Sequence, residues 1–459
     1  MPTRLTARWL LPVSDDPIAD AALLVGDDGR IADAGPDHAV PTPPGVREIR
    51  LGEAALLPGL VNVHAHPELT AMRGLLEDLP FHEWIPALLR AKINARLDGD
   101  DYLDCARYGC LEALRAGITT IGATEDSGAS LDALIALGMR GVVYREVFGP
   151  SPVRADAAMA QLRDNVDAMC ERATDLVRVG ISPHAPYTVS DRLYVLATEL
   201  ARAERLPVAV HAAESQAEHL LVTHGLGPFA DALGRRGVST PPRAPSTIAL
   251  LDQLGVLDTR PLLIHCVRLS TDDVSRIAAA GAPVAHCPTA NARLGHGIAP
   301  VTEMHEAGIT VALGTDSVAS NNRMDLLEEG RVAQVLQRAR LAAPAALPAA
   351  TLLRMATLDG ARALGLDARI GSLERGKDAD LCAVAFDAPS VAPVNDPLAA
   401  LFHSARASDV VLTMVRGRIL YDRAATATAP PSDRALAERI GAIASRLRHA
   451  LRSTANGSG

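Results

Sequence analysis

The feature that most constrains this chain is a short apolar stretch that ends in two histidines. Residues 57–63 read Leu-Pro-Gly-Leu-Val-Asn-Val, and His64 and His66 follow with one alanine between them. An apolar run bounded by Pro-Gly predicts a short buried strand. Alternate residues of a strand point to the same side, so the two imidazoles can face one metal ion. The alternative is that these histidines are two ordinary polar residues at the end of a strand. The polar residues in the rest of the chain decide between the two interpretations.

Similar apolar segments recur downstream and alternate with helical patterns, which predicts βαβ units and a parallel sheet. The candidate strands cover residues 61–66, 118–123, 141–146, 179–184, 208–211, 262–265, 283–286 and 310–316. Eight segments match the strand count of a (β/α)₈ barrel. Most of them end in His, Glu or Asp, and the carboxyl ends of barrel strands are where catalytic groups lie.

The chain outside these segments predicts a second, smaller unit. Short strands are expected within residues 1–57 and again at 371–376, 380–385, 410–415 and 418–421. Neither group can bury a core alone, so we expect the two ends to pair. We therefore predict an α/β fold: a TIM-like (β/α)₈ barrel at 58–365, a composite β-domain from 1–57 and 366–425, and a terminal helix (433–451) and tail within 426–459.

Three other segments carry specific expectations. Residues 101–116 and 191–204 are predicted helices, and Ser190 is placed to cap the second. The proline-containing stretch 225–247 is longer than a usual βα connection, so we expect it to form a lid or a side wall of a pocket.

Composition restricts the partners and the compartment. The formal net charge of −9 and the absence of a basic run argue against a nucleic-acid partner. The sequence contains no stretch of about 18 apolar residues that would predict a membrane span. The start lacks the pattern of a signal peptide, and the six cysteines form no regular framework. We therefore expect a cytoplasmic protein that acts on a small molecule.

Four more polar residues follow candidate strands. His211 and His265 end two apolar runs, Glu214 comes three residues after His211, and Asp316 lies in Gly-Thr-Asp-Ser. Each has an ordinary explanation: a locally bonded histidine, an acid in the first turn of a helix, or a turn aspartate. With His64 they occupy the same end of the first, fifth, sixth and eighth strands. That convergence predicts a metal site.

The motifs together resemble the amidohydrolase superfamily. The resemblance lies in the branch of methylthioadenosine/S-adenosylhomocysteine and aminofutalosine deaminases and s-triazine chlorohydrolases, and it covers nearly the whole chain. The matching segments are residues 58–66, 182–187, 211–215, 265–267, 286–288, 313–317 and 371–381.

In that family the matching positions imply that His64, His66, His211 and Asp316 bind one divalent ion. Three imidazoles and a carboxylate suit Zn²⁺, and Fe²⁺ is a rival with the same ligands. Many relatives hold two metals bridged by a modified lysine. This chain has lysine only at 92 and 377, neither at a barrel strand end, so we expect a mononuclear site.

The resemblance also implies the catalytic roles. The metal would activate a water, and Asp316 would be the general base. Glu214 would protonate the ring nitrogen next to the attacked carbon and then pass a proton to the departing amine. His265 would orient the water and polarise the reacting centre.

The resemblance is weaker at the residues expected to bind the substrate. His184 resembles a histidine near the sugar of nucleoside-deaminating relatives, and Arg145 resembles a substrate-binding arginine, although an ion pair is an equal explanation. Trp84 belongs to a segment that lines the pocket in those relatives. Their ribose-binding glutamate is Ile93 here, so either Glu68 replaces it or the substrate differs. The segments around Glu68 and Trp84 look closer to deaminases of aminofutalosine.

Three function classes remain open from the sequence. The leading one is a hydrolytic deaminase of an aminopurine nucleoside. A guanine-type deaminase or a hydrolase of triazine-like rings would use the same metal site. A non-catalytic scaffold is the third class, but it does not explain why the chain has all four expected metal ligands. By resemblance, we expect a homo-oligomer, a dimer or a tetramer.

Overall fold

The computed structural model describes residues 1–426 and 431–455. Within them, parallel strands form two four-stranded sheets, ordered β6-β7-β8-β9 and β10-β11-β12-β13. Single parallel bridges, Ile181 with Val208 and Ala65 with Asp316, join the two sheets into a closed barrel. The strands are β6 (Leu60–Ala65), β7 (Ile118–Glu125), β8 (Arg140–Val147), β9 (Val177–Pro183), β10 (Ala209–Ala212), β11 (Leu262–His265), β12 (Val284–His286) and β13 (Val311–Leu313). The predicted barrel is confirmed.

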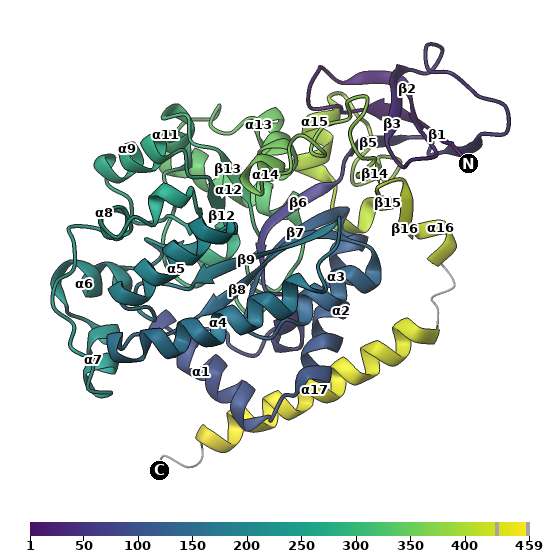
Figure 1. Cartoon of the computed structure of the whole chain (residues 1–459). Coiled ribbons are helices and arrows are strands. Elements are labelled where there is room, and N and C mark those ends of the chain that lie inside the picture. The colour runs from purple at the N-terminus through teal and green to yellow at the C-terminus, as the bar shows by residue number, and fades with distance from the viewer. Residues whose placement is uncertain (427–430, 456–459) are drawn as a thin grey trace.

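Helices cover the outside of the barrel (Figure 1). They are α1 (Phe81–Asn94), α2 (Gly99–Arg115), α3 (Ala129–Leu137), α4 (Ala155–Cys170), α5 (Asp191–Glu204), α6 (Gln216–His224), α7 (Pro228–Gly234), α8 (Thr247–Gln253), α9 (Thr271–Ala280), α10 (Pro288–Arg293), α11 (Val301–Glu306), α12 (Leu326–Leu341), α13 (Ala349–Ala356) and α14 (Leu358–Ala363). The predicted helix 191–204 has the predicted bounds, and the Ser190 side chain accepts the Leu193 N–H. The predicted helix 101–116 begins two residues earlier because Asp98 caps it.

The two ends of the chain form one sheet of order β16-β15-β14-β5-β1-β2-β3, with β4 paired to β1. Its strands are β1 (Thr3–Leu10), β2 (Ile18–Val25), β3 (Ile31–Pro36), β4 (Arg47–Arg50), β5 (Ala54–Pro58), β14 (Leu381–Ala385), β15 (Val410–Val415) and β16 (Arg418–Asp422). Antiparallel pairing of β5 with β14, with Leu56 opposite Ala383, joins the N-terminal part to the C-terminal part. The predicted composite β-domain is therefore present, and in Figure 1 it projects from one end of the barrel.

The predicted strand at 371–376 is wrong. Gly371 has φ +92°, a left-handed conformation that glycine adopts at little cost. The backbone N–H groups of Leu373 and Gly376 then donate to the carbonyls of Pro12, which follows β1, and Ile31, which begins β3. The segment therefore turns across the sheet instead of adding a strand to it.

A buried ion cluster connects the barrel to this sheet. Arg140 begins β8, and its Nε lies 2.7 Å from Asp380 Oδ2 while its Nη2 lies 2.9 Å from Asp378 Oδ2. Arg140 is fully buried, and both carboxylates are nearly so. Removing the arginine would leave the buried Asp380 without its arginine partner, whereas Asp378 would keep Arg369 at 2.8 Å. An uncompensated buried charge is strongly destabilising.

We expect Arg140→Ala to lower the free energy of unfolding by at least about 3 kcal/mol. Urea denaturation followed by circular dichroism measures the change. Arg172→Ala is the matched control, because the Arg172–Asp132 pair is almost half exposed; its loss should cost less than about 1 kcal/mol. Equal effects of the two substitutions would contradict the structural role of the cluster.

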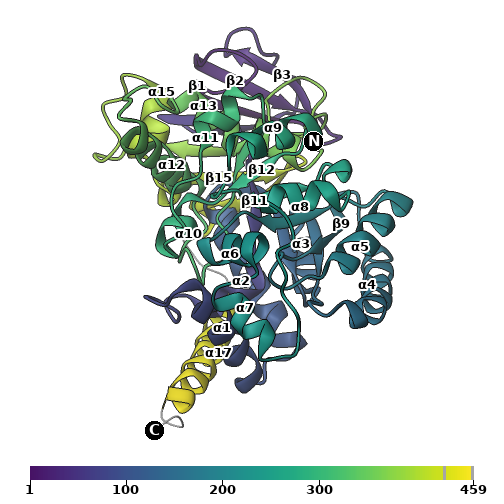
Figure 2. The same ribbon diagram turned by 90° about the vertical axis from the view of Figure 1, so that its left-hand side faces the viewer.

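The C-terminal helix α17 (Pro431–Ala455) runs along the barrel beside α1 and α2 (Figures 1 and 2). Its apolar side chains Leu436, Ile440 and Leu447 pack in the same cluster as Phe81 and Trp84 of α1. Arg439 pairs with Asp104, and Arg446 with Asp101. The helix extends past the predicted end at 451, and residues 456–459 of the predicted tail lie outside the described residues.

The remaining short helices are α15 (Pro397–Ala399) and α16 (Arg423–Thr426), and 3₁₀ or π turns cover Pro67–Met72, Pro152–Arg154, Leu257–Thr259, Ala400–Ser404 and Ala407–Asp409. None of the helices within 1–426 and 431–455 combines the length and apolar character needed to cross a bilayer.

Candidate metal centre and pocket

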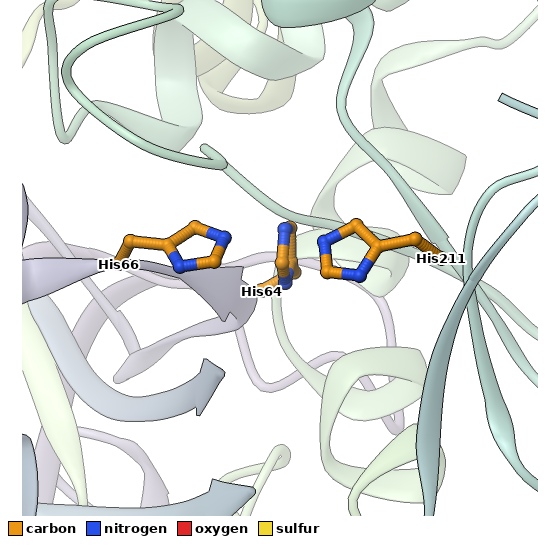
Figure 3. Close-up of side chains that lie close together, drawn as sticks. All are labelled: His64, His66 and His211. Atoms are coloured by element: carbon orange, nitrogen blue, oxygen red, sulfur yellow. The ribbon is translucent and has the colours of Figure 1, made fainter. Parts of the chain in front are cut away.

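Three imidazoles meet at the carboxyl ends of the barrel strands. His64 lies near the end of β6, His66 follows that strand, and His211 lies in β10 across the barrel (Figure 3). Nitrogen atoms of the three rings lie within 4.8 Å of one another. Asp316, which follows β13, places Oδ1 3.3 Å from His64 Nε2 and 3.6 Å from His66 Nε2. The structure thus brings together all four predicted ligands.

The donor set fits one divalent cation. His64 Nε2 is buried in the cluster, where it faces Asp316 Oδ1 at 3.3 Å. Burial lowers the pKa of His64 to about 4, so its imidazole is neutral and can bind a metal. His211 Nδ1 lies 3.3 Å from the His184 carbonyl oxygen, which fixes the ring with Nε2 free. Three nitrogens and one carboxylate oxygen suit Zn²⁺ or Fe²⁺.

The charges around the cluster favour a cation. Burial lowers the pKa of His66, but its hydrogen bond to Glu68 and the charges of Glu68, Glu146 and Asp316 outweigh burial and raise that pKa to about 9. The same negative field attracts a metal ion. Burial raises the pKa of Asp316, but the hydrogen bond to His64 and the charges of the histidines outweigh it and hold that pKa well below its ordinary value. Asp316 is therefore a carboxylate.

No lysine of the described residues lies among the candidate ligands. Lys92 lines the same pocket, but its Nζ lies 3.2 Å from Asp126 Oδ1. Lys377 lies at the β-sheet, 3.2 Å from Glu374. A lysine bridge between two metals therefore has no source in this part of the chain.

The backbone is strained where the site residues leave their strands. Ala213, His265, Cys266 and Asp316 have φ values between +48° and +76°, in the left-handed region that non-glycine residues rarely adopt. Such residues cost about 1–3 kcal/mol each and cluster at functional sites. A hydrogen bond of 2.6 Å from the Ser317 N–H to Asp316 Oδ1 and one of 3.0 Å from Ser320 Oγ to Oδ2 hold the aspartate in place.

Gly314 lets the end of β13 approach the candidate ligand His64. A Cβ atom there would lie 3.0 Å from both His64 Cβ and Cys287 Sγ. A side chain at this position would push β13 away from β6. The glycine therefore sets the distance between Asp316 and the two histidines of β6.

Glu214 lies beside the cluster and is held from three directions. The Tyr187 hydroxyl donates to its Oε2 at 3.0 Å, and its Oε1 lies 3.4 Å from His265 Nε2 and 3.3 Å from His296 Nε2. Asn291 Oδ1 lies 2.9 Å from His265 Nδ1, which orients that ring. Burial raises the pKa of Glu214, but the charges of the two histidines and the hydrogen bond to His296 outweigh it, so the pKa is lowered.

One cavity of about 330 Å³ opens onto the cluster and is lined by His66, His211, Glu214, His265 and Asp316. Its size is that of a small-molecule site. A large part of its wall is apolar and comes from α1 and neighbouring loops: Leu69, Phe81, Trp84, Ile85, Leu88, Leu89, Phe148 and Leu294.

Three of the four predicted substrate contacts line this cavity: Glu68, Trp84 and His184. Arg145 is not among its described lining residues, whereas its neighbour Glu146 is. Side chains alternate along β8, and Tyr144 packs with the interior valines of β6, which places Glu146 on the inner side and Arg145 on the other. The structure therefore does not bring Arg145 to the pocket.

The segment 225–247 forms a side wall. It contains α7, whose Phe229 stacks on Tyr187 with ring centroids 4.5 Å apart. Phe229 also meets Phe81 edge to face, at 6.0 Å. Arg236, just after α7, lines the cavity. The segment thus borders the pocket through the tyrosine that contacts Glu214.

Sequence reasoning missed several groups of the site. Tyr187 lies in the segment 182–187, which matches the family, but its position in the sequence gave no sign that its hydroxyl reaches Glu214. His296 and Asn291 lie outside the strand ends and carry no periodic signal. Glu146 ends a predicted strand, as several of the candidate ligands do, and that signal could have identified it.

Comparisons with known proteins agree with this geometry. The Amidohydrolase family matches residues 55–420. A methylthioadenosine/S-adenosylhomocysteine deaminase of Moorella thermoacetica is 34% identical over 90% of this chain and 92% of its own length. A 5′-deoxyadenosine deaminase of Methanothermobacter thermautotrophicus is 33% identical over 80% of this chain and 81% of its own.

Solved structures show the same architecture. An adenosine deaminase from Xanthomonas campestris with bound zinc has a TM-score of 0.82 and 29% identity, with 96% of this chain and 98% of that one covered. An aminofutalosine deaminase from Helicobacter pylori has a TM-score of 0.76 at 21% identity, covering 91% of this chain and 99% of its own, a likeness of fold alone. With its barrel, its composite sheet and its histidine–aspartate cluster, this chain belongs to the amidohydrolase family.

Proposed function

We propose that this protein is a mononuclear metal-dependent deaminase that releases ammonia from an aminopurine nucleoside. The observation that carries the proposal is the place of Glu214: a buried carboxylate, held by Tyr187, His265 and His296, that lines the same cavity as the four candidate ligands. A nucleobase in this cavity would meet an acid–base group and an activated water together. The names of the relatives point to the same substrate class.

The proposed reaction replaces an amino group by oxygen. A divalent ion at the site, when bound, lowers the pKa of water. Asp316 accepts a proton from the attacking water, and the new C–O bond forms at the ring carbon that bears the amine. Glu214 gives a proton to the adjacent ring nitrogen and later helps to pass one to the departing amine, so that water and substrate yield the oxo product and ammonia.

The lowered pKa of Glu214 adds a constraint on this sequence of proton transfers. An ionised carboxylate cannot donate until it has gained a proton. In this proposal the attacking water supplies both protons: Glu214 takes one and carries it to the ring nitrogen, and Asp316 takes the other, which passes to the departing amine. His265, whose Nδ1 is held by Asn291, directs Nε2 toward the reacting centre.

Two buried carboxyl oxygens in the cavity are suited to accept hydrogen bonds from a ribose. Glu68 Oε2 and Glu146 Oε1 are buried and have no hydrogen-bond partner among the described residues. His184 Nε2 lies 3.9 Å from Glu146 Oε1, and its Nδ1 lies 2.7 Å from Thr188 Oγ1. Ribose hydroxyls would supply the donors that these groups lack. Ile93 is 71% exposed, so Glu68 is the better candidate for the ribose contact.

Parallel assays of ammonia release test the proposal. The panel is adenosine, 5′-deoxyadenosine, methylthioadenosine, S-adenosylhomocysteine and aminofutalosine, with guanine and atrazine as representatives of the other ring classes. We expect turnover of at least one nucleoside and little or none of guanine and atrazine. Turnover confined to guanine or atrazine, or no ammonia from any nucleoside, would overturn the proposal.

The cytoplasmic location, the homo-oligomeric state and the domain boundaries stay predictions.

A further inference from the structure

A second cavity lies at the opposite end of the barrel from the candidate metal centre, where the strands begin. Its volume is about 640 Å³, within the range of small-molecule sites. It is lined by Arg178 near the start of β9, Val208 just before β10, Leu262 at the start of β11 and Pro283 just before β12. Because the catalytic groups of such barrels lie at the carboxyl ends of the strands, this cavity is separate from the candidate active site.

The charged side chains that line this cavity are all positive. They are five arginines, and none of the described acidic residues lines it with them: Arg178, Arg202, Arg205, Arg260 and Arg362. The chain as a whole carries a formal net charge of −9. A cavity lined by charges of one sign focuses their field and attracts the opposite charge. This end of the barrel therefore attracts anions, although the protein is acidic overall.

Ion pairs neutralise only two of the five arginines. Arg202 Nη2 lies 2.7 Å from Asp258 Oδ2, and Arg362 Nη1 lies 3.0 Å from Asp359 Oδ1. The other three arginines form no ion pair with any residue of 1–426 or 431–455. Three positive charges thus line the cavity without an internal counter-charge.

The surroundings of Arg178 add to the excess of positive charge. Partial burial lowers the pKa of its guanidinium, the Tyr144 phenol raises that pKa in part, and the charges of Arg369 and Arg140 lower it further. Its Nη2 donates to the carbonyl oxygen of Leu364, which is a neutral acceptor. An anion in the cavity would supply the negative charge that this guanidinium lacks.

The other two unpaired arginines stand on ordered backbone. Arg205 follows α5 with φ +56°, and its N–H donates to the Ala201 carbonyl. Arg260 follows the turn Leu257–Thr259 with φ +51°, and its N–H donates to the Leu257 carbonyl at 3.0 Å. Both side chains are exposed, but the ends of two structured elements hold them at the cavity.

We propose that this cavity binds a diphosphate or triphosphate group through Arg178, Arg205 and Arg260. The planar fork of an arginine matches two phosphate oxygens. Arginines from three separate elements suit a ligand with more than one phosphate, because each phosphate can engage its own guanidinium. The inference concerns a second site and does not depend on the proposed deaminase function.

Isothermal titration calorimetry of the metal-loaded protein tests the site. The probes are inorganic pyrophosphate, tripolyphosphate and UDP, a nucleotide without the aminopurine ring of the proposed substrate. Inorganic phosphate is the single-anion control. We expect one probe molecule to bind per chain, at least about tenfold more tightly than phosphate, because a second phosphate adds a charge-assisted contact.

The same titrations separate the two sources of the group. Tighter binding of UDP than of pyrophosphate assigns the site to a nucleotide, and tighter binding of pyrophosphate or tripolyphosphate assigns it to a free inorganic ion. No binding of any of the three probes, or equal affinity for phosphate and pyrophosphate, would overturn the inference.

Substitutions of the unpaired arginines locate the bound anion. Arg205→Ala and Arg260→Ala should each raise the Kd about tenfold through the loss of one charge-assisted contact. Arg260→Lys should keep part of the affinity because it keeps the charge. Arg375→Ala is the matched control, because Arg375 is an exposed arginine that does not line the cavity; it should leave the Kd as in the wild type.

Metal content is measured before and after each titration, because pyrophosphate also binds metal ions. A Kd that is unchanged in both alanine variants would place the anion at the metal centre or elsewhere, and the inference would fail while the proposed function stands.

Discussion

Glu214→Gln should lower kcat by about 10²–10⁴-fold, the usual effect of losing a general acid–base group. The amide has nearly the shape of the carboxyl group and can still accept from Tyr187, but it cannot carry a proton to the ring nitrogen. Its neighbours His265 and His296 lie within 3.4 Å of the present carboxylate, so the geometry is retained. Steady-state ammonia release on the best nucleoside measures the loss.

The control for this substitution is Glu199→Gln, an isosteric change on the exposed face of α5, which should keep the wild-type kcat. Metal content, measured on the same preparations, should be equal in all three proteins because Glu214 is not a proposed ligand. Near-wild-type kcat in Glu214→Gln would refute its role, and a parallel loss of metal would show that it acts on the ligands instead.

Asp316→Asn should lower both metal content and kcat, the latter by at least about a hundredfold. The substitution removes the negative charge that faces His64 and His66 at 3.3 Å and 3.6 Å, together with the proposed base. Asparagine keeps the size of the side chain, and β13 should stay in place. Elemental analysis and ammonia release are measured on protein purified without chelators.

Asp367→Asn, on an exposed turn far from the ligands in sequence, is the isosteric control and should keep both properties. Because Asp316 has two proposed roles, added metal should not restore kcat even where it restores occupancy. Full recovery of kcat by excess zinc would show that the aspartate serves only as a ligand.

Much of the site could be predicted because barrel topology converts sequence order into spatial position. His64, His211, His265 and Asp316 lie at or just after the carboxyl ends of strands that meet at one edge, so finding the strands was sufficient to place them together. The pairing of the two chain ends could be expected because neither group of strands could bury a core alone.

The structure differs from the sequence-based expectations where side-chain direction or a turn decided the outcome. Arg145 and Glu146 are adjacent on β8, and a shift of one residue exchanges the inner and outer faces of a strand. Residues 371–376 resembled a strand in composition, but Gly371 turns the chain. His296 reaches Glu214 through a loop, and loop paths depend on tertiary packing that periodicity does not report.

The central claim is that one divalent ion, held by His64, His66, His211 and Asp316, is required for deamination. Titration of metal-free protein with zinc, while ammonia release from the best nucleoside is recorded, tests it most directly. Activity should be absent without metal, rise linearly and reach a plateau at one ion per chain. Full activity in metal-free protein, a plateau at two ions, or bound zinc without ammonia release would contradict it.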